Sequence, residues 1–347
     1  MTEPSSDMNI PSTEGPVLGI ETSCDETAAS VLATDGRVLS NVIFSQHLVH
    51  QRFGGVVPEL ASRAHVEKIE QVVLAAMDDS GLAWKDLGGI AVTHGPGLAG
   101  ALIVGVSYAK SLAYSLDIPL VGVSHLEGHI ASAWLHDPLF PLPCVVLVVS
   151  GGHTHLYLRK PIGSDQLLGC TRDDAAGEAF DKGAQMLGIG YPGGPALDRL
   201  AHQGNPRLFS FPRSSIRGGG FDFSFSGLKT ALLYRLQVMN HDDVTRAKCD
   251  LAAGYQEAIV AMLAEKAFAA TRQTGVMSLA VVGGVSANTR LRTVFQEMAN
   301  ARGVRLSIPP VQFCTDNAAM IALAGQQALR EGRRMSLDAE AWATLRQ

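Results

Sequence analysis

The feature that most constrains the fold of this 347-residue chain is a hairpin pattern that occurs twice. Two short apolar segments, Val17–Thr22 and Thr27–Ala33, open the patterned part of the sequence. The pattern returns at Val145–Val149 and His153–Arg159, which are joined by a Gly-Gly turn. Both hairpins precede segments in which apolar strands alternate with helical periodicity, and this alternation is typical of α/β folds with mainly parallel sheet. We therefore predict an α/β fold built by internal duplication.

The length of the chain indicates two lobes, because it exceeds what one hydrophobic core usually supports. Hydrophobic residues make up 46% and charged residues 18%, which is ordinary globular composition. The first sixteen residues lack Lys, Arg and any apolar run, so we interpret them as a disordered leader and not as a signal peptide. The predicted parts are a leader at 1–16, lobe I at 17–123 plus 317–335, lobe II at 124–316 and a tail at 336–347.

The composition predicts a cytoplasmic protein without membrane association. We find no apolar stretch that reaches the ~18 residues of a membrane span. The cysteines are odd in number and lack C-x-x-C spacing, which is typical of free thiols in a reducing compartment. They are Cys24, Cys144, Cys170, Cys249 and Cys314. The Gly/Ala-rich segment Leu98–Leu116 is predicted to be a helix, and it could cover a sheet or present a surface to a partner.

Two histidines in the predicted helix His125–Leu135 form a candidate metal site. His125 and His129 are four residues apart, so they lie on one helix face and could bind one metal ion. The same spacing also occurs in polar residues near a turn. Proteases with the H-E-x-x-H motif carry Glu directly after the first His, whereas Glu127 lies midway between the two histidines here. This position argues against that class of protease.

A third ligand could come from Asp316, which opens the predicted helix Asn317–Arg330. The alternative is that Asp316 caps this helix, and the spacing by itself favours the cap. Two histidines and one carboxylate would leave open coordination positions, as a catalytic metal site requires. This ligand set favours Fe(II), with Zn(II) as the alternative.

Three glycine-rich turns could hold a nucleotide-type ligand. They lie at Ser150–Thr154, Tyr191–Pro195 and Gly283–Asn288. Glycine lets backbone N–H groups approach a phosphate, and the third turn precedes a helix N-terminus that would favour an anion. Any one of these turns is typical of an ordinary connection, but together they favour a nucleotide. Acidic side chains near these elements are Asp25, Glu26, Glu178 and Asp181, with solvated surface charge as the alternative interpretation.

A dinucleotide-binding motif is excluded. Residues 95–100 match G-x-G-x-x-G between a strand and a helix. The acidic residue at the expected distance, Asp117, comes before the next strand instead of ending one. The chain also has no G-x-x-x-x-G-K-[ST] sequence, so a P-loop nucleotidase is not predicted.

The segment 199–235 is basic although the chain carries a net charge of −5. Its basic residues are Arg199, Arg207, Arg213, Arg217, Lys229 and Arg235, and Asp222 is its acidic residue. Its phenylalanines are Phe209, Phe211, Phe221, Phe223 and Phe225. Basic and aromatic side chains together suit an RNA backbone with unstacked bases. The alternative is a solvated insertion that the phenylalanines anchor to the core.

Several sequence runs in the same order resemble one family. They are Gly19–Thr27, Gly54–Arg63, His125–His129, Val149–Thr154, Asp173–Lys182, Phe223–Thr230, Gly283–Asn288 and Cys314–Asn317. These runs look like the hallmark motifs of the tRNA N(6)-adenosine threonylcarbamoyltransferases, once described as O-sialoglycoprotein endopeptidases. The resemblance spans about Val17 to Arg330 and leaves the first sixteen residues outside it.

The resemblance implies a two-lobed actin/Hsp70/sugar-kinase fold around a nucleotide cleft. It implies metal ligands at His125, His129 and Asp316. It implies a threonylcarbamoyl-adenylate site lined by Val148, Val149, Ser150, Gly151, Gly152, Asp181, Gly194, Asp198 and Asn288. No residue pattern identifies the catalytic base of the implied reaction, and Asp25 is our candidate for it.

The activity implied by the resemblance is metal-dependent transfer of threonylcarbamoyl from threonylcarbamoyl-AMP to the N(6) amine of adenosine 37 in tRNA. The implied partners are tRNA, a smaller paralogous subunit and an ATPase subunit. Two other classes stay open at this point. One is a metalloprotease, suggested by the paired histidines, and the other is a non-catalytic ATP-binding scaffold, which would not need three metal ligands.

Overall fold

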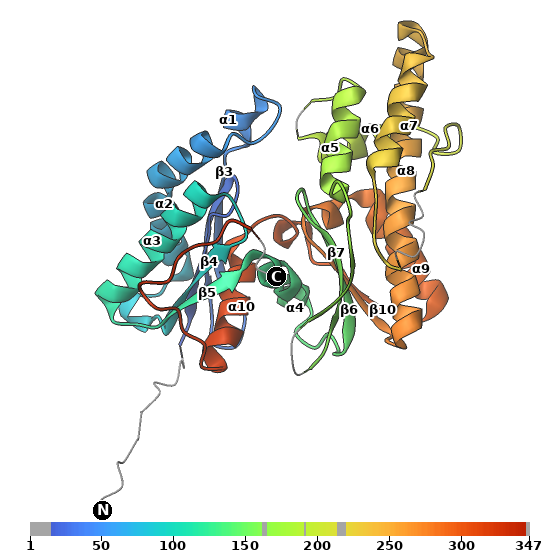
Figure 1. Cartoon of the computed structure of the whole chain (residues 1–347). Helices are drawn as coiled ribbons and strands as arrows, with labels where there is room; N and C mark the ends of the chain where they lie inside the picture. Colours follow the sequence, from blue (N-terminus) through green and yellow to red (C-terminus); the bar gives the residue numbers. More distant parts are fainter. Residues whose placement is uncertain (1–14, 162–164, 191, 214–219, 345–347) are drawn as a thin grey trace, which may run out of the picture. The chain divides into compact units, whose positions relative to one another are not determined.

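The computed structural model describes residues 15–161, 165–190, 192–213 and 220–344. These residues divide into two compact units. Figure 1 shows the chain coloured along its sequence. The first unit contains 15–46, Pro58–Gly128 and the chain from Asn317 onward, and the second contains His47–Val57 and His129–Asp316. Of the predicted leader, residues 1–14 lie outside the described residues.

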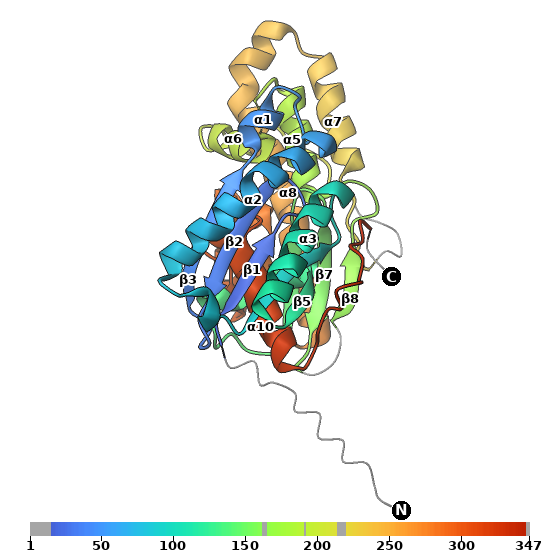
Figure 2. The ribbon, with the colours of Figure 1, turned by 90° about the vertical axis from the view of Figure 1, so that its left-hand side faces the viewer.

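The first unit is built on a five-stranded sheet in the order β3-β2-β1-β4-β5. Its strands are β1 (Val17–Glu21), β2 (Glu26–Leu32), β3 (Val38–Ser45), β4 (Gly89–Gly95) and β5 (Leu120–Ser124). The first three strands form an antiparallel meander, whereas β4 and β5 continue from β1 in parallel. Figure 2 shows β3, β2 and β1 next to one another. The polar turns after β1 and β2 are short enough to favour antiparallel pairing, and parallel pairing follows where helices connect the strands.

Helices cover both faces of this sheet. They are α2 (Pro58–Ser80), α3 (Ala99–Leu116) and α10 (Ala318–Arg330). Leu18 and Ile20 of β1 belong to the core that α2 and α3 complete. Gly19 faces the other way, and a Cβ on it would lie 2.4 Å from the carbonyl oxygen of Ala318. A larger residue at this position would therefore push α10 off the sheet.

The second unit repeats this plan with the order β10-β9-β6-β7-β8. Its strands are β6 (Cys144–Val149), β7 (Thr154–Arg159), β8 (Gln166–Cys170), β9 (Ser278–Val282) and β10 (Arg305–Ser307). The strands β6, β7 and β8 pair antiparallel, and β9 and β10 continue from β6 in parallel. The same arrangement of three antiparallel and two parallel strands therefore occurs twice. This confirms the predicted α/β fold with duplicated halves.

Most of the remaining helices build the core of the second unit. They are α5 (Ala176–Met186), α6 (Gly193–Ala201), α7 (Ser226–Gln237), α8 (His241–Thr274) and α9 (Thr289–Arg302). Short elements complete the chain: α1 (His47–Gln51), α4 (His125–His136), η1 (Trp84–Asp86), η2 (Gly284–Ala287) and η3 (Val311–Phe313). Helix α8 contributes Tyr255, which is fully buried and donates its hydroxyl hydrogen to the carbonyl oxygen of Ala179 at 3.0 Å.

Helix α3 corrects the expectation that no apolar stretch is as long as a membrane span. In the part of the chain that the structure describes, it is the one helix long and apolar enough to cross a membrane, with a mean hydropathy of 1.2 over 18 residues. This test uses length and composition only, and the core helices of many proteins pass it. A third of α3 is buried, through residues such as Leu102, Val106 and Ala109 that pack in the first unit. Asp117 ends the helix in the left-handed conformation, consistent with a cap.

The C-terminal segment lies against the first sheet. The backbone N–H of Met335 donates to Leu120 at 2.7 Å, and that of Trp342 donates to His94 at 2.9 Å. The Trp342 ring also contacts the His94 ring edge-to-face, with centroids 5.5 Å apart. The polar sequence after Arg330 did not predict these contacts, which attach the segment to β4 and β5.

Candidate functional site

Helix α4 begins directly after β5 and carries the two predicted metal-ligating histidines. His125 and His129 are one helical turn apart, with exposed fractions of 6% and 0%. His129 Nε2 lies 3.2 Å from Asp316 Oδ1. Asp316 is not the cap of α10, because Asn317 takes that position and accepts a hydrogen bond from Met320 N at 3.1 Å. The carboxylate of Asp316 thus contacts His129 and does not cap the helix.

The three side chains fit a divalent metal ion in donor chemistry and spacing. One ligand atom from each of His125, His129 and Asp316 lies within 4.8 Å of the other two. Two imidazoles and one carboxylate are a donor set that proteins use for catalytic Fe(II) and Zn(II). Together they would leave coordination positions for a substrate.

A buried carboxylate adjoins the first of these histidines. Glu21, at the end of β1, is fully buried, and its Oε2 lies 3.1 Å from His125 Nδ1. The same oxygen accepts a hydrogen bond from Thr93 Oγ1 at 2.6 Å, while Oε1 accepts one from Ser23 N at 2.5 Å. No motif or spacing in the sequence points to a role for Glu21. The signal that could have found it is a single carboxylate at the end of an otherwise apolar, buried strand.

The first glycine turn of the predicted substrate site joins β6 to β7. Val148 and Val149 before it are fully buried, and Ser150 N donates to His153 O at 2.8 Å. Gly151 and Gly152 are exposed, and a Cβ on either would meet no protein atom within 4 Å. Neither has a positive φ. The fold therefore does not itself require glycine at these two positions.

The third glycine turn, in contrast, needs its first glycine. Gly283 has φ +94°, and a Cβ on it would lie 2.4 Å from the carbonyl oxygen of Val149. A side chain there would be strained in its backbone and would collide with β6. This contact brings the turn before α9 next to the turn after β6.

The other predicted substrate residues are connected by hydrogen bonds within the second unit. Asp181 Oδ1 on α5 accepts from Gly194 N on α6 at 3.0 Å. Asp198 on α6 accepts from both the backbone N–H and the hydroxyl of Thr289, each at 3.0 Å. Asn288 caps α9 by accepting from Leu291 N, and it donates to Gln256 Oε1 at 2.8 Å.

The pKa of Asp181 is raised above its ordinary value. Burial is the main cause, because it disfavours the charged carboxylate. Hydrogen bonds from the N–H groups of Gly194 and Gly193 lower the pKa and offset part of this effect. Asp181 is thus a carboxylate held in a partly desolvated position.

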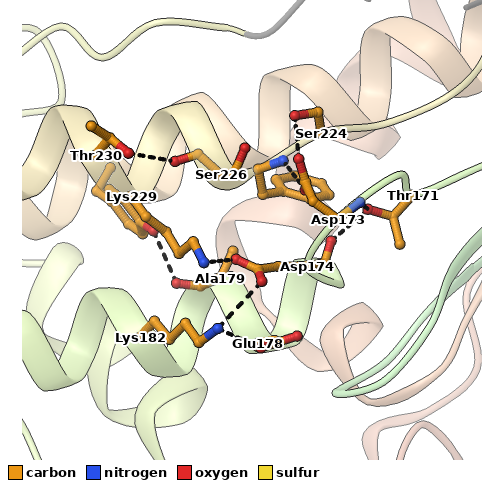
Figure 3. A network of polar contacts seen from close by, with 12 residues as sticks. Thr171, Asp173, Asp174, Glu178, Ala179, Lys182, Ser224, Ser226, Lys229 and Thr230 are labelled. Carbon is orange, nitrogen blue, oxygen red and sulfur yellow. Dashed lines mark hydrogen bonds and ion pairs between the residues drawn. The ribbon is translucent and has the colours of Figure 1, made fainter.

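A polar network next to this region joins the start of α5 to α7 (Figure 3). Lys229 of α7 forms an ion pair with Asp174. Lys182 Nζ lies 3.3 Å from Asp174 Oδ1 and 2.5 Å from Glu178 Oε1. The hydrogen bond to Glu178 is the main reason that the pKa of Lys182 is raised. Lys182 is therefore a charged structural group and unsuited to act as a base.

Asp173, the residue before Asp174, belongs to the same network (Figure 3). Its carboxylate accepts from Ser224 Oγ at 2.5 Å and from Phe225 N at 2.8 Å. Burial raises the pKa of Asp173, but these hydrogen bonds outweigh burial and hold the pKa below its ordinary value. Asp173 and Asp174, through Ser224, Phe225 and Lys229, thus hold the loop before α5 against the start of α7.

Asp25, the candidate base, lies in the turn between β1 and β2 of the first unit. Its carbonyl oxygen accepts a hydrogen bond from Gln46 N at 3.0 Å. This contact uses the backbone and assigns no chemical role to the side chain. The role of Asp25 stays a prediction.

The phenylalanines and the arginines of the basic segment 199–235 differ in burial. Phe211, Phe223 and Phe225 are buried in the core of the second unit, so they anchor the segment and are not exposed to stack on bases. Arg207 and Arg213 are exposed, and both line a surface cavity of about 630 Å³. Arg213 is also paired with Glu265 at 2.5 Å. Arg217 lies outside the described residues.

The sequence matches a protein family described as "TsaD: tRNA N6-adenosine threonylcarbamoyltransferase" over residues 37–323. A protein of that name from Syntrophus aciditrophicus is 52% identical over 326 residues, covering 94% of this chain and 96% of the relative. Another from Anaeromyxobacter dehalogenans is 53% identical, covering 94% of this chain and 97% of the relative.

Solved structures with little sequence identity share the fold. Component A of (R)-2-hydroxyglutaryl-CoA dehydratase from Acidaminococcus fermentans superimposes with a TM-score of 0.54 at 16% identity, covering 90% of this chain and 98% of that one. HypF from T. kodakarensis superimposes with a TM-score of 0.61 at 16% identity, covering 92% of this chain and 48% of that one. These likenesses show the two-lobed actin/Hsp70/sugar-kinase type of fold and carry no conclusion about activity.

Proposed function

The chain belongs to the tRNA N6-adenosine threonylcarbamoyltransferase family, and from that premise we propose that it forms threonylcarbamoyladenosine at tRNA position 37. The proposed donor is threonylcarbamoyl-AMP and the proposed acceptor is the N6 amine of adenosine. One observation carries this proposal, namely the family match over residues 37–323, which includes every predicted metal and adenylate residue. The chain is accordingly a transferase.

The glycine turn after β6 supports a site for the phosphate of the donor. The fold leaves open space where Gly151 and Gly152 would carry side chains, so backbone N–H groups there can approach a phosphate closely. Gly283 contrasts with them because the fold itself requires it. We propose that Asp181, Gly194, Asp198 and Asn288, linked as described above, bind the adenosine part.

The donor is a mixed anhydride, so AMP is a good leaving group and the protein mainly positions the two reactants. In this proposal His125, His129 and Asp316 hold one divalent metal ion, Fe(II) first and Zn(II) as the alternative. A bound ion would supply Lewis-acid polarisation of the carbonyl or a template for the threonyl part. Asp25 is proposed to accept the proton that the N6 amine loses.

The direct test uses the purified protein with threonylcarbamoyl-AMP and unmodified tRNA, followed by mass spectrometry of the tRNA nucleosides. We expect threonylcarbamoyladenosine to appear with the donor and to be absent when the donor is omitted. Absence of product with donor, metal and both partner subunits present would refute the function. Cleavage of a glycoprotein that chelator abolishes, without any transfer, would instead favour the metalloprotease.

The proposal includes tRNA, a smaller paralogous subunit and an ATPase subunit as partners, and the cytoplasm as location. Helix α3 is the candidate surface for the smaller subunit. Its outward face carries Ile103 and Tyr114, with exposed fractions of 58% and 76%. Large apolar side chains that are this exposed can form the centre of a protein interface.

We expect tRNA binding to depend on the basic segment. Replacing Arg207, Arg213 and Arg217 with Ala should flatten the log–log plot of affinity against salt, by about 0.9 for each phosphate that is no longer neutralised and less for single strands. The Michaelis constant for tRNA should rise, and nucleotide affinity should stay unchanged. Because Arg213 is already paired with Glu265, Arg207 should contribute more than Arg213.

Arg246 provides the matched control for this experiment. It is an exposed arginine on α8 that pairs with Asp243 and lies outside the basic segment. Arg246→Ala should leave the salt slope at the wild-type value. If the triple variant also keeps the wild-type slope, the basic segment does not bind tRNA, and the partner subunits become the candidates.

We expect Asp181→Asn to increase the free energy of unfolding near pH 7 while weakening nucleotide binding. The raised pKa of Asp181 means that folding favours its protonated form, so its charge destabilises the native state above the folded pKa. The gain over wild type should shrink as the pH falls through the raised folded pKa, and it should no longer change below about 4, the ordinary aspartate value. Urea unfolding at several pH values measures this, and a variant less stable than wild type at pH 7 would contradict it.

A further inference from the structure

We propose that Glu21 is a positioning residue, whose carboxylate fixes His125 in the tautomer that can bind metal through Nε2. This inference rests on the proposed metal site of His125, His129 and Asp316. It adds a residue from the first strand of the chain to that site, and it assigns a purpose to a fully buried carboxylate.

The geometry defines which ring nitrogen carries the proton. His125 Nδ1 lies 3.1 Å from Glu21 Oε2. A carboxylate offers only acceptors, so this contact is a hydrogen bond when Nδ1 carries the hydrogen. A neutral imidazole has a single N–H, and the lone pair is then on Nε2. Metal-bound histidines commonly have this arrangement, with the other nitrogen donating to a carboxylate or carbonyl.

The surroundings hold Glu21 in this orientation. Oε1 accepts from the backbone N–H of Ser23 at 2.5 Å, and Oε2 also accepts from the hydroxyl of Thr93 at 2.6 Å. The hydroxyl of Ser23 lies 3.1 Å from the same His125 nitrogen, where it can share that hydrogen. Both carboxylate oxygens thus face donors, and the side chain cannot turn without breaking these bonds.

A second buried histidine in the same unit, His65, can be compared with His125. His65, on α2, is also fully buried, but its Nδ1 contacts the hydroxyl of Thr27 at 2.7 Å and its Nε2 contacts the carbonyl oxygen of Cys24 at 3.0 Å. These two contacts of His65 are with uncharged oxygens, whereas His125 Nδ1 contacts a carboxylate. A buried carboxylate costs free energy unless it is fully hydrogen-bonded, so packing does not account for Glu21.

The substitution Glu21→Gln tests the proposal because it keeps the size of the side chain. An amide NH₂ on the Oε1 side would face the fixed N–H of Ser23, so it should lie on the Oε2 side, where the Thr93 hydroxyl can rotate and accept. His125 Nδ1 must then accept a hydrogen bond, which moves the proton to Nε2. We expect the affinity of the full-length protein for Co²⁺ or Zn²⁺ to fall about 10- to 100-fold.

Thr93→Val is the matched control, because it removes a hydrogen bond at the same carboxylate oxygen but keeps the carboxylate. We expect its metal affinity to stay within about threefold of wild type, since Glu21 still orients the ring. Nitrogen-15 NMR of the histidine rings in the metal-free protein adds a readout that a structural role would not change. It should show hydrogen on Nδ1 of His125 in wild type and Thr93→Val, and on Nε2 in Glu21→Gln.

The outcomes separate this inference from the metal site itself. If His125→Ala and His129→Ala lose metal but Glu21→Gln keeps wild-type affinity and tautomer, Glu21 is not a positioning residue. If both histidine variants keep metal, the proposed metal site is wrong. Should Glu21→Gln fail to fold, the NMR of the wild type decides, because hydrogen on Nε2 of His125 there overturns the inference.

Discussion

The substitution His129→Ala should remove bound metal and reduce threonylcarbamoyl transfer by more than about 100-fold, because loss of a ligand exceeds the 10- to 100-fold typical of an outer-shell partner. Asp316→Asn should act in the same direction, since Asp316 lies 3.2 Å from His129 and an amide is a poorer ligand than a carboxylate. Elemental analysis of the purified variants measures metal occupancy, and the nucleoside assay measures transfer.

Both variants are expected to fold. His129 is fully buried, so its replacement leaves a small cavity and should cost about 1–3 kcal/mol, which a chain with two extensive cores can tolerate. His65→Ala is the control, because it also removes a fully buried histidine but one that is bound to Thr27 and Cys24. It should lose comparable stability and keep its metal. Full metal occupancy in His129→Ala and Asp316→Asn would exclude the proposed site.

Ala109→Glu on helix α3 should unfold or strongly destabilise the protein. Ala109 is fully buried in the core of the first unit, and an unpaired charge placed there should cost about 3–5 kcal/mol. The sequence suggested Leu98–Leu116 both as a partner surface and as a sheet-covering helix, and its burial pattern shows that separate faces would serve the two roles. Thermal unfolding of the purified variant, or its absence from the soluble fraction, measures the effect.

Tyr114→Glu is the matched variant on the exposed face of the same helix. It should change stability by no more than about 0.5 kcal/mol, as surface substitutions usually do. If this face binds the smaller subunit, the affinity should fall at least about tenfold, because large aromatic side chains often dominate interfaces. Size-exclusion chromatography with the partner checks this. Unchanged association with Tyr114→Glu and Ile103→Glu would exclude α3 as the interface.

Periodicity determined most of the secondary structure of this chain. The hairpins, the long helices and the repeated α/β plan follow from local spacing of apolar residues, and the structure places them with small shifts at their ends. Strand β8 and helix α1 were missed. β8 is a half-exposed edge strand without regular alternation, and α1 has five residues, so neither has enough local signal.

Local sequence also defined the candidate site in part. The spacing of His125 and His129 predicted a pair of candidate ligands, because one helical turn brings such residues together whatever the rest of the chain does. Spacing by itself favoured Asp316 as the cap of α10 over its alternative role as a third ligand, whereas the structure gives the cap to Asn317. A shift of one residue decides which side chain caps a helix, and sequence patterns do not locate helix ends that closely.

Only the tertiary structure decided which distant residues meet. It brought Glu21 to Thr93 and His125, because β1, β4 and the start of α4 meet at one end of the first sheet. It also placed Asp316, far along the chain, next to His129. It also buried three phenylalanines that the sequence had offered as possible stacking groups, and it separated the buried and exposed faces of α3. Local propensity acts within a few residues, whereas burial and polar partnership depend on segments that packing of the whole chain places side by side.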